Sequence, residues 1–536
     1  MSTSTAAAAA VDSAESYYTP LSDISTTVDS LHKTFASGRT RPLAYRAKLL
    51  SALLDGLKDL ESELANAIHA DMRRAPAHNL AFEIWVAQKE CQEYLDKLEL
   101  WAAPESVRSE SVAFIQDTLE IRKEPQGVVL IAGPWNYPVR LLVLPLIGAI
   151  AAGNCVVVKP SEIAVHSMRA ITKLVDGYLD PSVVRVVNGA VEQSTELLKY
   201  HFDHIFYTGA GSIGKIYMAA GARNLCPVTL ELGGKSPAII DSNLVDMKRA
   251  AERIVWGKFI NTSQTCVAVD YILVMRSVYP RFVQLLGNAI KGAFGADPKQ
   301  SADYGRIISK RHFLRLRNVL ERSVATGKVN LVGSYGQKVM LDDLDEDDLY
   351  IPPTIVSGAP KDDPLMEDEI FGPILPVIVV DSIQEAVDYI NTKDNPLAMY
   401  IFTANTGTTA KYILDNTRSG GAVVNDTAMH MAAPELPFGG CGASGIGAYH
   451  GKHTFETFVH RRSVLTRQAT GPYKLDALRF MPLTGPENAW KLDAIKTLLY
   501  APPHSQMTGV QRAVRMVPGV STALTLIYVL RLLIGI

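Results

Sequence analysis

The stretch that decides the fold class is residues 204–231, which read HIFYTGAGSIGKIYMAAGARNLCPVTLE. A mostly apolar run at 204–208 is followed by a glycine-rich loop, a helical pattern over 213–222 and a second apolar run at 228–230. A strand, a loop, a helix and a strand in this order predict a βαβ unit of a parallel sheet.

The same alternation continues towards the N-terminus. Apolar runs occur at 128–132, 156–159 and 183–187, and helical patterns at 141–152 and 167–178 separate them. Strands that read as nearly continuous apolar runs are buried on both faces of a sheet. These residues therefore predict a doubly wound α/β domain.

A second alternation follows towards the C-terminus. Its strand-like runs lie at 238–240, 271–275, 374–380, 399–403 and 422–425, and helical patterns occur at 281–294 and 313–325. The predicted fold class is α/β, with two doubly wound units in tandem. Gly233 and Gly234 mark the seam between the units, where we expect a cleft.

Two helical patterns, at 42–72 and 82–101, precede the first unit. The period of the apolar residues then changes over 111–124, which predicts strands of a projecting hairpin. Residues 1–20 contain Ser, Thr and an alanine tract, without the basic and apolar segments of a signal sequence. We expect residues 1–20 to form a disordered leader.

Composition excludes several classes of function. The 536 residues include 53 Lys+Arg and 55 Asp+Glu, so the chain lacks the concentrated basic charge that nucleic-acid binding requires. Five cysteines without a CxxC pair argue against a disulfide framework or a zinc site and favour a reducing compartment. The acidic run LDDLDEDDLY at 341–350 is interpreted as a solvated loop, and no metal site is predicted.

Cys266 stands out because it follows a polar stretch, NTSQT at 261–265. A single cysteine is more often a buried core residue, but a cysteine in a polar loop at a cleft can act as a nucleophile. A nucleophilic thiol needs a base or a positive field. Glu231, which ends the apolar run at 228–230, could be that base if the fold brings it near. The other four cysteines are interpreted as structural.

The loop after 204–208 contains a literal G-x-G-x-x-G, in which Gly209, Gly211, Ser212 and Gly214 are candidates for phosphate binding. Phosphates bind where helix N-terminal amides and the helix dipole meet negative charge. The loop does not belong to the first βα unit, however, and a plain tight turn is the alternative interpretation.

Two further loops follow predicted strands. In GPWNYP at 133–138, Asn136 offers an amide donor suited to an oxyanion, although a turn-forming role is the alternative. In KPSE, Lys159 and Glu162 stand where an adenosine ribose could bind, or they form a solvated ion pair at the end of a strand.

Taken together, the motifs resemble the aldehyde dehydrogenase superfamily over about residues 31–462. The matching segments, in order, are PWNYP (134–138), KPSE (159–162), FYTGAGSIGK (206–215), LELGGKSP (230–237), NTSQTC (261–266), EIFGPILPV (369–377) and PFGG (437–440). The stretch GASGIGAYHGKHTFETF at 442–458 is most similar to the class 3, fatty-aldehyde branch.

The resemblance implies an NAD(P)-dependent aldehyde dehydrogenase of EC 1.2.1 type. Cys266 would attack the aldehyde, Asn136 and the backbone N–H of Cys266 would hold the oxyanion, and Glu231 would activate water to hydrolyse the thioester. The family typically has serine where this chain has Ala210, and class 3 relatives often have cysteine where it has Thr262.

The cofactor implied by the resemblance is NAD, with NADP possible. Trp135 would line the cofactor cleft, Lys159 and Glu162 would bind the adenosine ribose, and Glu369 would hold the nicotinamide ribose with Phe371 beside the ring. The loop containing Gly209, Gly211, Ser212 and Gly214 would face the pyrophosphate. Because Glu162 accepts a 2′-hydroxyl and repels a 2′-phosphate, we expect NAD to be preferred.

The resemblance also implies a division of the chain into domains. A Rossmann-like dinucleotide-binding domain is expected at 21–110 and 125–230, a catalytic domain at 231–430, and oligomerisation or bridging β arms of a homodimer at 111–124 and 431–470. Residues 471–511 would form a tail linker.

The C-terminal residues 517–530 are uncharged, and a helix of about 20 residues spans a bilayer core. We therefore predict a membrane anchor at 512–536, with the catalytic part facing the cytoplasm. A soluble, docked helix is the alternative.

Long-chain fatty aldehydes and apocarotenoid aldehydes such as β-apo-4′-carotenal are the expected substrates. A cofactor-independent cysteine hydrolase and a catalytically silent membrane scaffold are the competing hypotheses.

Overall fold

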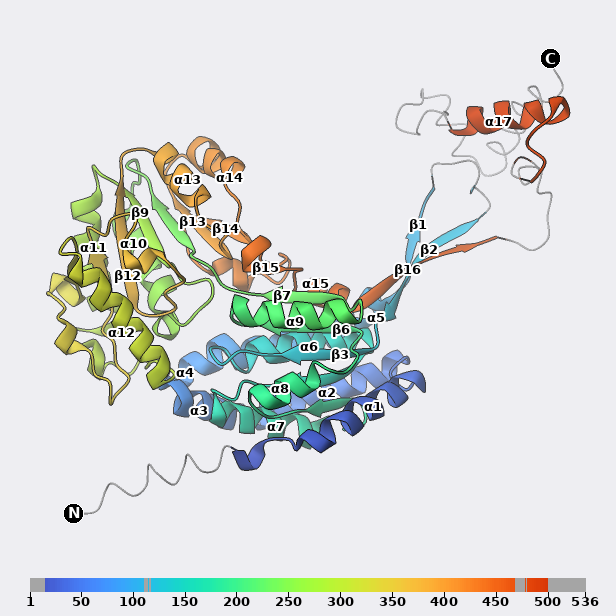
Figure 1. Cartoon of the computed structure of the whole chain (residues 1–536), viewed down its shortest axis with the longest axis horizontal. Coiled ribbons are helices and arrows are strands. Elements are labelled where there is room, and N and C mark those ends of the chain that lie inside the picture. Colours follow the sequence, from blue (N-terminus) through green and yellow to red (C-terminus); the bar gives the residue numbers. More distant parts are fainter. Residues whose placement is uncertain (1–14, 110–113, 115–116, 468–477, 479, 500–536) are drawn as a thin grey trace. The chain divides into compact units, whose positions relative to one another are not determined.

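The computed structural model describes residues 15–109, 114, 117–467, 478 and 480–499 (Figure 1). The chain divides into a larger unit, drawn from 1–101 and 125–459, and a smaller unit, drawn from 102–124 and 460–536. The predicted leader is described only from Glu15, where Glu15–Tyr17 form a 3-10 turn. The predicted anchor at 512–536 lies outside the described residues, and no helix within them is long and apolar enough to cross a bilayer.

The larger unit contains a six-stranded sheet in the order β15-β7-β6-β3-β4-β5. The strands are β3 (Val128–Ala132), β4 (Cys155–Lys159), β5 (Val184–Val186), β6 (His204–Thr208), β7 (Val228–Glu231) and β15 (Gly445–Ile446). All neighbours are parallel except β15, which pairs antiparallel with β7. Strands β3, β4 and β6 are completely buried, as their apolar runs predicted.

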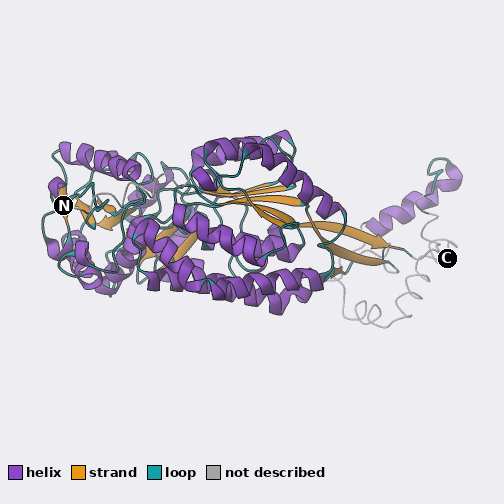
Figure 2. Cartoon of the chain, turned by 90° about the horizontal axis from the view of Figure 1, so that it is seen from below, coloured by secondary structure: helices purple, strands orange, loops and turns teal. Residues whose placement is uncertain are grey.

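Helices cover both faces of this sheet (Figure 2). Those between its strands are α6 (Arg140–Ala152), α7 (Val165–Tyr178), α8 (Val191–Leu197) and α9 (Gly211–Arg223). The chain adds β4 and β5 on one side of β3, and β6 and β7 on the other. The loops after β3 and β6 therefore flank the point where the strand order reverses, which is where doubly wound sheets bind ligands. This topology explains why the glycine-rich loop need not follow the first strand.

The second sheet of the larger unit has seven strands in the order β10-β11-β12-β9-β8-β13-β14. They are β8 (Pro237–Ile240), β9 (Tyr271–Met275), β10 (Asn330–Val332), β11 (Thr354–Ser357), β12 (Ile374–Val380), β13 (Ala398–Phe402) and β14 (Gly421–Val424). Only β10 pairs antiparallel. The accompanying helices are α10 (Met247–Phe259), α11 (Tyr279–Phe294), α12 (Lys310–Ala325), α13 (Ile383–Asn391) and α14 (Lys411–Asn416). The prediction of two tandem doubly wound units is confirmed.

The N-terminal helices differ in detail from the prediction. They are α1 (Leu21–Ala36), α2 (Leu43–Asp59), α3 (Glu61–Met72), α4 (Pro76–Asn79), a π-helical turn (Leu80–Ile84) and α5 (Trp85–Ala102). The single helix expected over 42–72 breaks at Leu60, whose ψ of 10° leaves the helical range. Helix α2 packs on both α6 and α7, whereas α3 packs on α7 and α4. The break lets each half bury its own apolar face.

The smaller unit contains a three-stranded sheet in the order β1-β2-β16. Its strands are β1 (Glu105–Val107), β2 (Thr118–Pro125) and β16 (Val459–Thr466), and β1 pairs antiparallel with β2. Ion pairs join Arg461 to Glu105 and Arg462 to Glu124 across this sheet. A short turn (Pro486–Asn488) and α17 (Ala489–Leu499) complete the described part of the unit.

Candidate functional site

Cys266 follows a loop whose backbone is strained and fixed. Asn261, Thr262 and Ser263 have φ values of 51°, 53° and 64°, and non-glycine residues in this region cost on the order of 1–3 kcal/mol each. The buried Gln264 side chain donates to the carbonyls of Asn261 (3.2 Å) and Arg306 (3.0 Å) and accepts from the Ile308 N–H (2.9 Å). The loop is thus held by a side chain that sequence reasoning treated only as a polar neighbour.

The loop after β3 is joined to the cysteine loop by buried hydrogen bonds. The Asn136 amide donates to the Gln264 carbonyl (3.0 Å), and the Asn261 amide donates to the Asn136 carbonyl (2.9 Å). The hydroxyls of Tyr137 and Thr265 share a further hydrogen bond of 2.9 Å. The structure therefore brings Asn136 to the cysteine loop, and its amide nitrogen retains a second N–H.

A buried ion pair supports the loop after β3. Arg74 pairs with Glu83, and both are almost inaccessible to solvent. The other Glu83 oxygen accepts from the backbone N–H groups of Val139 (2.9 Å) and Arg140 (3.1 Å), while Arg74 donates to the Asn136 carbonyl (3.3 Å). Sequence reasoning missed this pair, because nothing in its local pattern separates it from ordinary charged residues of helices.

Cys266 and Glu231 together line two adjoining cavities of the larger unit. The first, here called the apolar cavity, encloses about 30 Å³ and is lined by Tyr137, Arg140, Leu141, Thr208, Glu231, Leu232, Thr265, Cys266, Leu397, Met431, Phe438, Tyr449 and His450. The second, here called the cleft cavity, encloses about 230 Å³ and is lined by Pro134, Trp135, Asn136, Leu141, Thr208, Gly209, Ala210, Glu231, Leu232, Gly233, Cys266, His312, Arg315, Glu369 and Phe371. The nucleophile and the base proposed from sequence therefore share a wall between two binding spaces.

The acid–base properties of Glu231 and Cys266 follow from their burial. Glu231 ends β7 with only 2% of its surface exposed, and neither carboxylate oxygen has a hydrogen-bond partner in the described part of the chain. Burial raises the pKa of Glu231 well above 4.5. Burial, and then the nearby carboxylates of Glu369 and Glu231, raise the pKa of the Cys266 thiol to about 12. Such a thiol needs a proton acceptor to react, and Glu231 stands beside it in both cavities.

The far end of the cleft cavity is formed by an aromatic group and a carboxylate. The Trp135 ring packs edge-on against Phe371 at 5.5 Å between centroids. Glu369 lies so close to Gly233 that a Cβ there would be 2.1 Å from its carboxylate, so any larger residue at 233 would displace the Glu369 side chain. Burial, together with the neighbouring Asp270 carboxylate, raises the pKa of Glu369 to about 8.

Three charged residues that sequence reasoning missed hold this end in place. Lys235 pairs with Asp270 (2.6 Å) and also donates to the carbonyls of Leu365 and Asp368 (2.8 Å each). Arg315 donates to the Ile370 carbonyl (2.6 Å). Lys235 belongs to the LELGGKSP motif, but its partners are more than thirty residues away in the chain, so local sequence does not reveal them.

Lys159 and Glu162 lie outside both cavities. The buried Lys159 ends β4, donates to the Pro160 carbonyl (2.8 Å) and stands 3.5 Å from a Glu162 oxygen, and its pKa is lowered by burial. Burial raises the pKa of Tyr217 on α9 to about 12, and the Glu162 carboxylate adds to that shift. Glu162 therefore lies near the helix that carries the glycine-rich loop.

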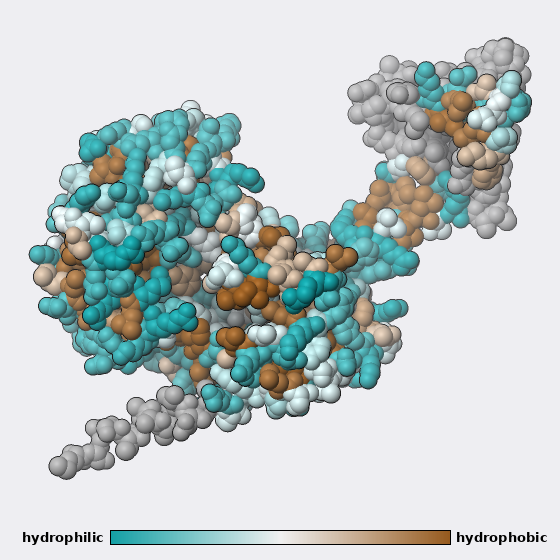
Figure 3. Space-filling view, viewed as in Figure 1, coloured by the Kyte–Doolittle hydropathy of each residue, from teal (hydrophilic) through white to brown (hydrophobic). Residues whose placement is uncertain are grey.

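The glycine-rich loop leads directly into α9. Of its four predicted residues, Gly209 lines the cleft cavity, while Gly211 and Ser212 form the first turn of the helix. Gly214 packs so closely on the Leu232 side chain that a Cβ would approach it to 2.9 Å. Apolar side chains lie on the surface at α9 (Figure 3), where Ile216 is 54% exposed. Ile216 also lines a groove of about 690 Å³ with other residues of α9, with Thr195 of α8 and with Leu198 and Lys199, which follow α8.

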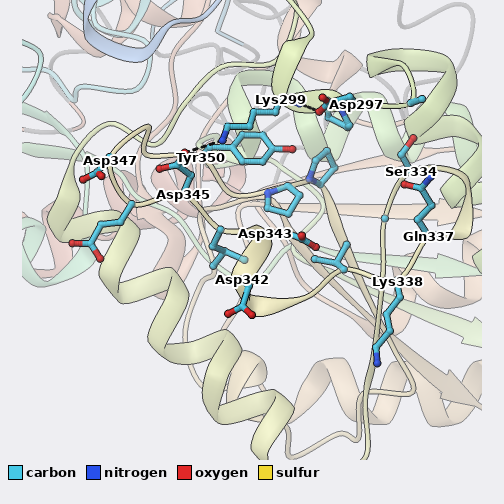
Figure 4. A pocket seen from close by; sticks show the side chains of 18 residues that line it. Asp297, Lys299, Ser334, Gln337, Lys338, Asp342, Asp343, Asp345, Asp347 and Tyr350 are labelled. Carbon is cyan, nitrogen blue, oxygen red and sulfur yellow. Dashed lines mark hydrogen bonds and ion pairs between the residues drawn. The ribbon is translucent and has the colours of Figure 1, made fainter.

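A wide acidic cavity of about 720 Å³ lies elsewhere in the larger unit, around the run at 341–350 (Figure 4). Asp342, Asp343, Asp345 and Asp347 line it, and Asp345 forms an ion pair with Lys299 at 2.8 Å. Among the residues that the structure describes, no three His, Cys, Asp or Glu side chains are grouped to hold a metal. The cavity shares no lining residue with the cavities at Cys266.

Comparison with known proteins adds three findings. Residues 10–464 match the model of the aldehyde dehydrogenase family. The chain is 43% identical over 447 residues to a rat "Aldehyde dehydrogenase, dimeric NADP-preferring", covering 83% of this chain and 95% of that one, and 42% identical over 464 residues to rat "Aldehyde dehydrogenase family 3 member A2", covering 86% and 92%. The substrate-bound structure of AldH from Staphylococcus aureus superposes with a TM-score of 0.83 at 36% identity, covering 89% of this chain and 99% of that one.

Proposed function

The chain belongs to the aldehyde dehydrogenase family, and from this premise we propose that it oxidises long, apolar aldehydes to carboxylic acids at Cys266. Family membership confirms the predicted enzyme class, an oxidoreductase that acts on aldehydes with NAD(P). The observation that carries the proposal is the position of Cys266 and Glu231 on the wall shared by the apolar and cleft cavities. A nucleophile in this position can contact an aldehyde from one side and a cofactor from the other.

The first half of the reaction forms a bond to sulfur. Glu231 takes the Sγ proton as the thiolate attacks the carbonyl carbon, and the carbonyl oxygen becomes an alkoxide. The free N–H of the Asn136 amide and the backbone N–H of Cys266 hold that alkoxide. Trp135, Glu369 and Phe371 would hold NAD(P)⁺, which would supply the hydride acceptor for the former aldehyde carbon, so that a thioester would remain on Cys266.

The second half releases the acid. Once Glu231 has passed the Sγ proton to solvent, it takes a proton from a water molecule whose oxygen attacks the thioester carbon. The C–S bond then breaks, and the Cys266 thiolate that leaves takes up the proton from Glu231. Both halves use the Glu231 carboxylate as a base, and the lack of hydrogen-bond donors to it keeps its basicity high. A carboxylate held by strong donors would be a weaker base.

The cofactor site fits the residues of the cleft. Trp135 and Phe371 would enclose the nicotinamide, and Glu369 would accept hydrogen bonds from its ribose. The N-terminal turn of α9 would face the pyrophosphate, and the groove between α8 and α9 would receive the adenine. Support for this placement comes from the glycine at 233, because a side chain there would displace Glu369.

We place the adenosine ribose at Lys159 and Glu162, and expect NAD to be preferred over NADP. Glu162 disfavours a 2′-phosphate, but its ion pair with Lys159 weakens that effect. The rat relative named NADP-preferring shows that both cofactors must be tested.

The lining of the apolar cavity supports an apolar substrate. Leu141, Leu232, Leu397, Met431 and Phe438 are among the residues that line it. Fatty aldehydes and apocarotenoid aldehydes both fit this chemistry, and we propose that the enzyme meets them at a membrane through the segment 512–536, with its catalytic part on the cytoplasmic side. We further propose a homodimer formed through the β1-β2-β16 sheet, where Val107 and Leu465 are exposed.

The test is formation of NADH or NADPH by the purified protein with decanal and with a retinal-type aldehyde, for the full chain and for a chain ending at 511. Thioester cleavage without any reduced cofactor would instead favour the cysteine hydrolase, for which the cleft residues Trp135, Glu369 and Phe371 have no use. The shortened chain should leave the membrane fraction and keep its activity on hexanal. Retention of the shortened chain on membranes would contradict the anchor.

A further inference from the structure

The apolar cavity contains one charged side chain that the proposed mechanism does not use. Arg140 lines this cavity together with Cys266 and Glu231, and it is the only Lys or Arg among the described residues that do so. The cavity is otherwise lined by apolar side chains and by hydroxyl and imidazole groups. Burial and the positive charge of Arg140 lower the pKa of His450 well below 6.5, so this imidazole is neutral.

The Arg140 guanidinium is largely without partners in the described part of the chain. One nitrogen, Nη2, donates to the Met431 carbonyl at 2.9 Å. No carboxylate of the described residues lies within ion-pair distance of it, although its charge interacts with the buried Glu90 carboxyl. Its remaining N–H groups are therefore available to a molecule in the cavity.

The charge of Arg140 is balanced only at a distance, by the buried Glu90 carboxyl: burial raises the pKa of Glu90 to about 7, and Arg140 opposes that rise. Arg140 is the first residue of α6, where the positive end of the helix dipole disfavours a positive charge. Its backbone is nevertheless fixed, because its N–H donates to Glu83, which is held in turn by Arg74. The result is a rigidly based guanidinium next to a helix N-terminus, and both features attract an anion.

We propose that Arg140 binds a carboxylate in the apolar cavity, which it lines together with Cys266. The inference rests on the proposed function, because that reaction creates a carboxylate in this cavity from a neutral aldehyde. A planar guanidinium can bind both carboxylate oxygens through two parallel hydrogen bonds, which a lysine ammonium cannot do. The carboxylate has two possible sources: the acid just formed, or a second acid group on the substrate, as in an ω-oxo acid.

The two sources are distinguished by two measurements on the full-length protein. The first is the Kd of hexanoate, measured by calorimetry without turnover. The second is the ratio of kcat/KM for 6-oxohexanoate to that for hexanal. Both are measured for the wild type, Arg140→Gln, Arg140→Lys and the control Arg249→Gln, which changes an exposed arginine of α10 that lines neither cavity.

Arg140→Gln should weaken hexanoate binding at least about tenfold if the product is the source, as expected for the loss of charge-assisted hydrogen bonds. If the bound carboxylate is instead a second acid group of the substrate, Arg140→Gln should lower the ratio of kcat/KM for 6-oxohexanoate to that for hexanal by a similar factor. Arg140→Lys should fall between Arg140→Gln and the wild type, and Arg249→Gln should match the wild type.

Melting curves of each variant show whether it is folded, and Arg140→Lys preserves the test if Arg140→Gln does not fold. A folded Arg140→Gln or Arg140→Lys that matches the wild type in both measurements overturns the proposal. Failure of the wild type to oxidise any aldehyde would contradict the proposed function instead, and the Kd of hexanoate would still report on Arg140.

Discussion

The two loops that meet the cleft cavity are built in opposite ways. The loop before Cys266 contains three residues with left-handed backbone, and the buried amide of Gln264 fixes it to the segment 306–308 through two hydrogen bonds. The glycine-rich loop before α9 is held by one long side-chain hydrogen bond, from the Tyr207 hydroxyl to the Ala210 carbonyl (3.4 Å), and it exposes Ser212 to solvent. A nucleophile must be held to a fraction of an ångström, whereas a phosphate site needs only accessible backbone amides. The loop before Cys266 is therefore rigid, whereas the loop at Gly209–Gly214 is accessible to a ligand.

The largest expected effect comes from removing the nucleophile that the rigid loop presents. Cys266→Ala should reduce both NADH formation and thioester turnover by at least about 10³-fold, because no other described residue of the two cavities can form the thioester. Initial rates with decanal and with a p-nitrophenyl ester measure both activities. Cys155→Ala is the control, because Cys155 is buried in β4 and should affect only the melting temperature. Near-wild-type turnover by Cys266→Ala would contradict the mechanism.

Removing the base should separate the two halves of the reaction. Glu231→Gln should form the thioester more slowly, because the thiol loses its proton acceptor. It should then accumulate acyl-enzyme, with steady turnover about 10²–10⁴-fold lower, because the general base for water is lost as well. Stopped-flow absorbance shows the burst of NADH, and intact-protein mass spectrometry shows the acyl group. Normal steady turnover would exclude Glu231 from hydrolysis of the thioester.

The same carboxyl predicts a pH dependence with a definite sign. Its pKa is raised above 4.5 in the folded protein, so wild-type turnover should rise with pH as Glu231 ionises. Stability should move in the opposite direction. The unfolded chain loses the proton near pH 4.5, so the folded state becomes less stable as pH rises from there through the folded pKa. Melting temperatures between pH 5 and 9 should fall more steeply for the wild type than for Glu231→Gln, and equal slopes would contradict the burial-raised pKa.

Loosening the rigid loop tests the comparison itself. Gln264→Ala removes three hydrogen bonds from the segment beside Cys266, and we expect kcat to fall about tenfold to 10²-fold, since small displacements of a reacting group have effects of this size. The dissociation constant of NAD should change far less, because Gln264 lines neither cavity. Ser212→Ala is the matched change in the glycine-rich loop. If Ser212→Ala lowered kcat more than Gln264→Ala does, the conclusion that catalysis depends on the rigid loop before Cys266 would be contradicted.

Features set by a local sequence pattern could be predicted, whereas features set by residues distant in the chain could not. The sheets were predictable because their strands are buried on both faces and their apolar runs are uninterrupted, as at 128–132 and 204–208. Cys266, Glu231 and Asn136 could be proposed from the sequence because each lies in a loop or at a strand end of a recognisable motif. Gln264, Arg74, Glu83 and Arg140 were not found, since their roles depend on partners distant in the chain or on a cavity that no local pattern records. The break between α2 and α3 at Leu60 was not predicted either, because it depends on tertiary packing and the local helical pattern is continuous there.

The smallest expected effect concerns the cofactor side of the comparison. Glu162 is partly exposed and is paired with Lys159 at 3.5 Å, so its negative charge is both screened and partly neutralised before a ribose arrives. A 2′-phosphate there should be disfavoured only weakly, and the ratio of kcat/KM for NAD to that for NADP should narrow about two- to fivefold in Glu162→Gln, as expected for one partly exposed charge. Steady-state rates at fixed hexanal with each cofactor give this ratio, and Glu192→Gln, which changes an exposed carboxylate at the start of α8, provides the control. Raising the salt concentration should narrow the wild-type ratio in the same direction, because screening weakens the repulsion that Glu162 exerts. If this ratio of kcat/KM values is the same in Glu162→Gln and in the wild type, Glu162 does not recognise the 2′-position of the ribose. The accessible cofactor side would then select between NAD and NADP through other residues.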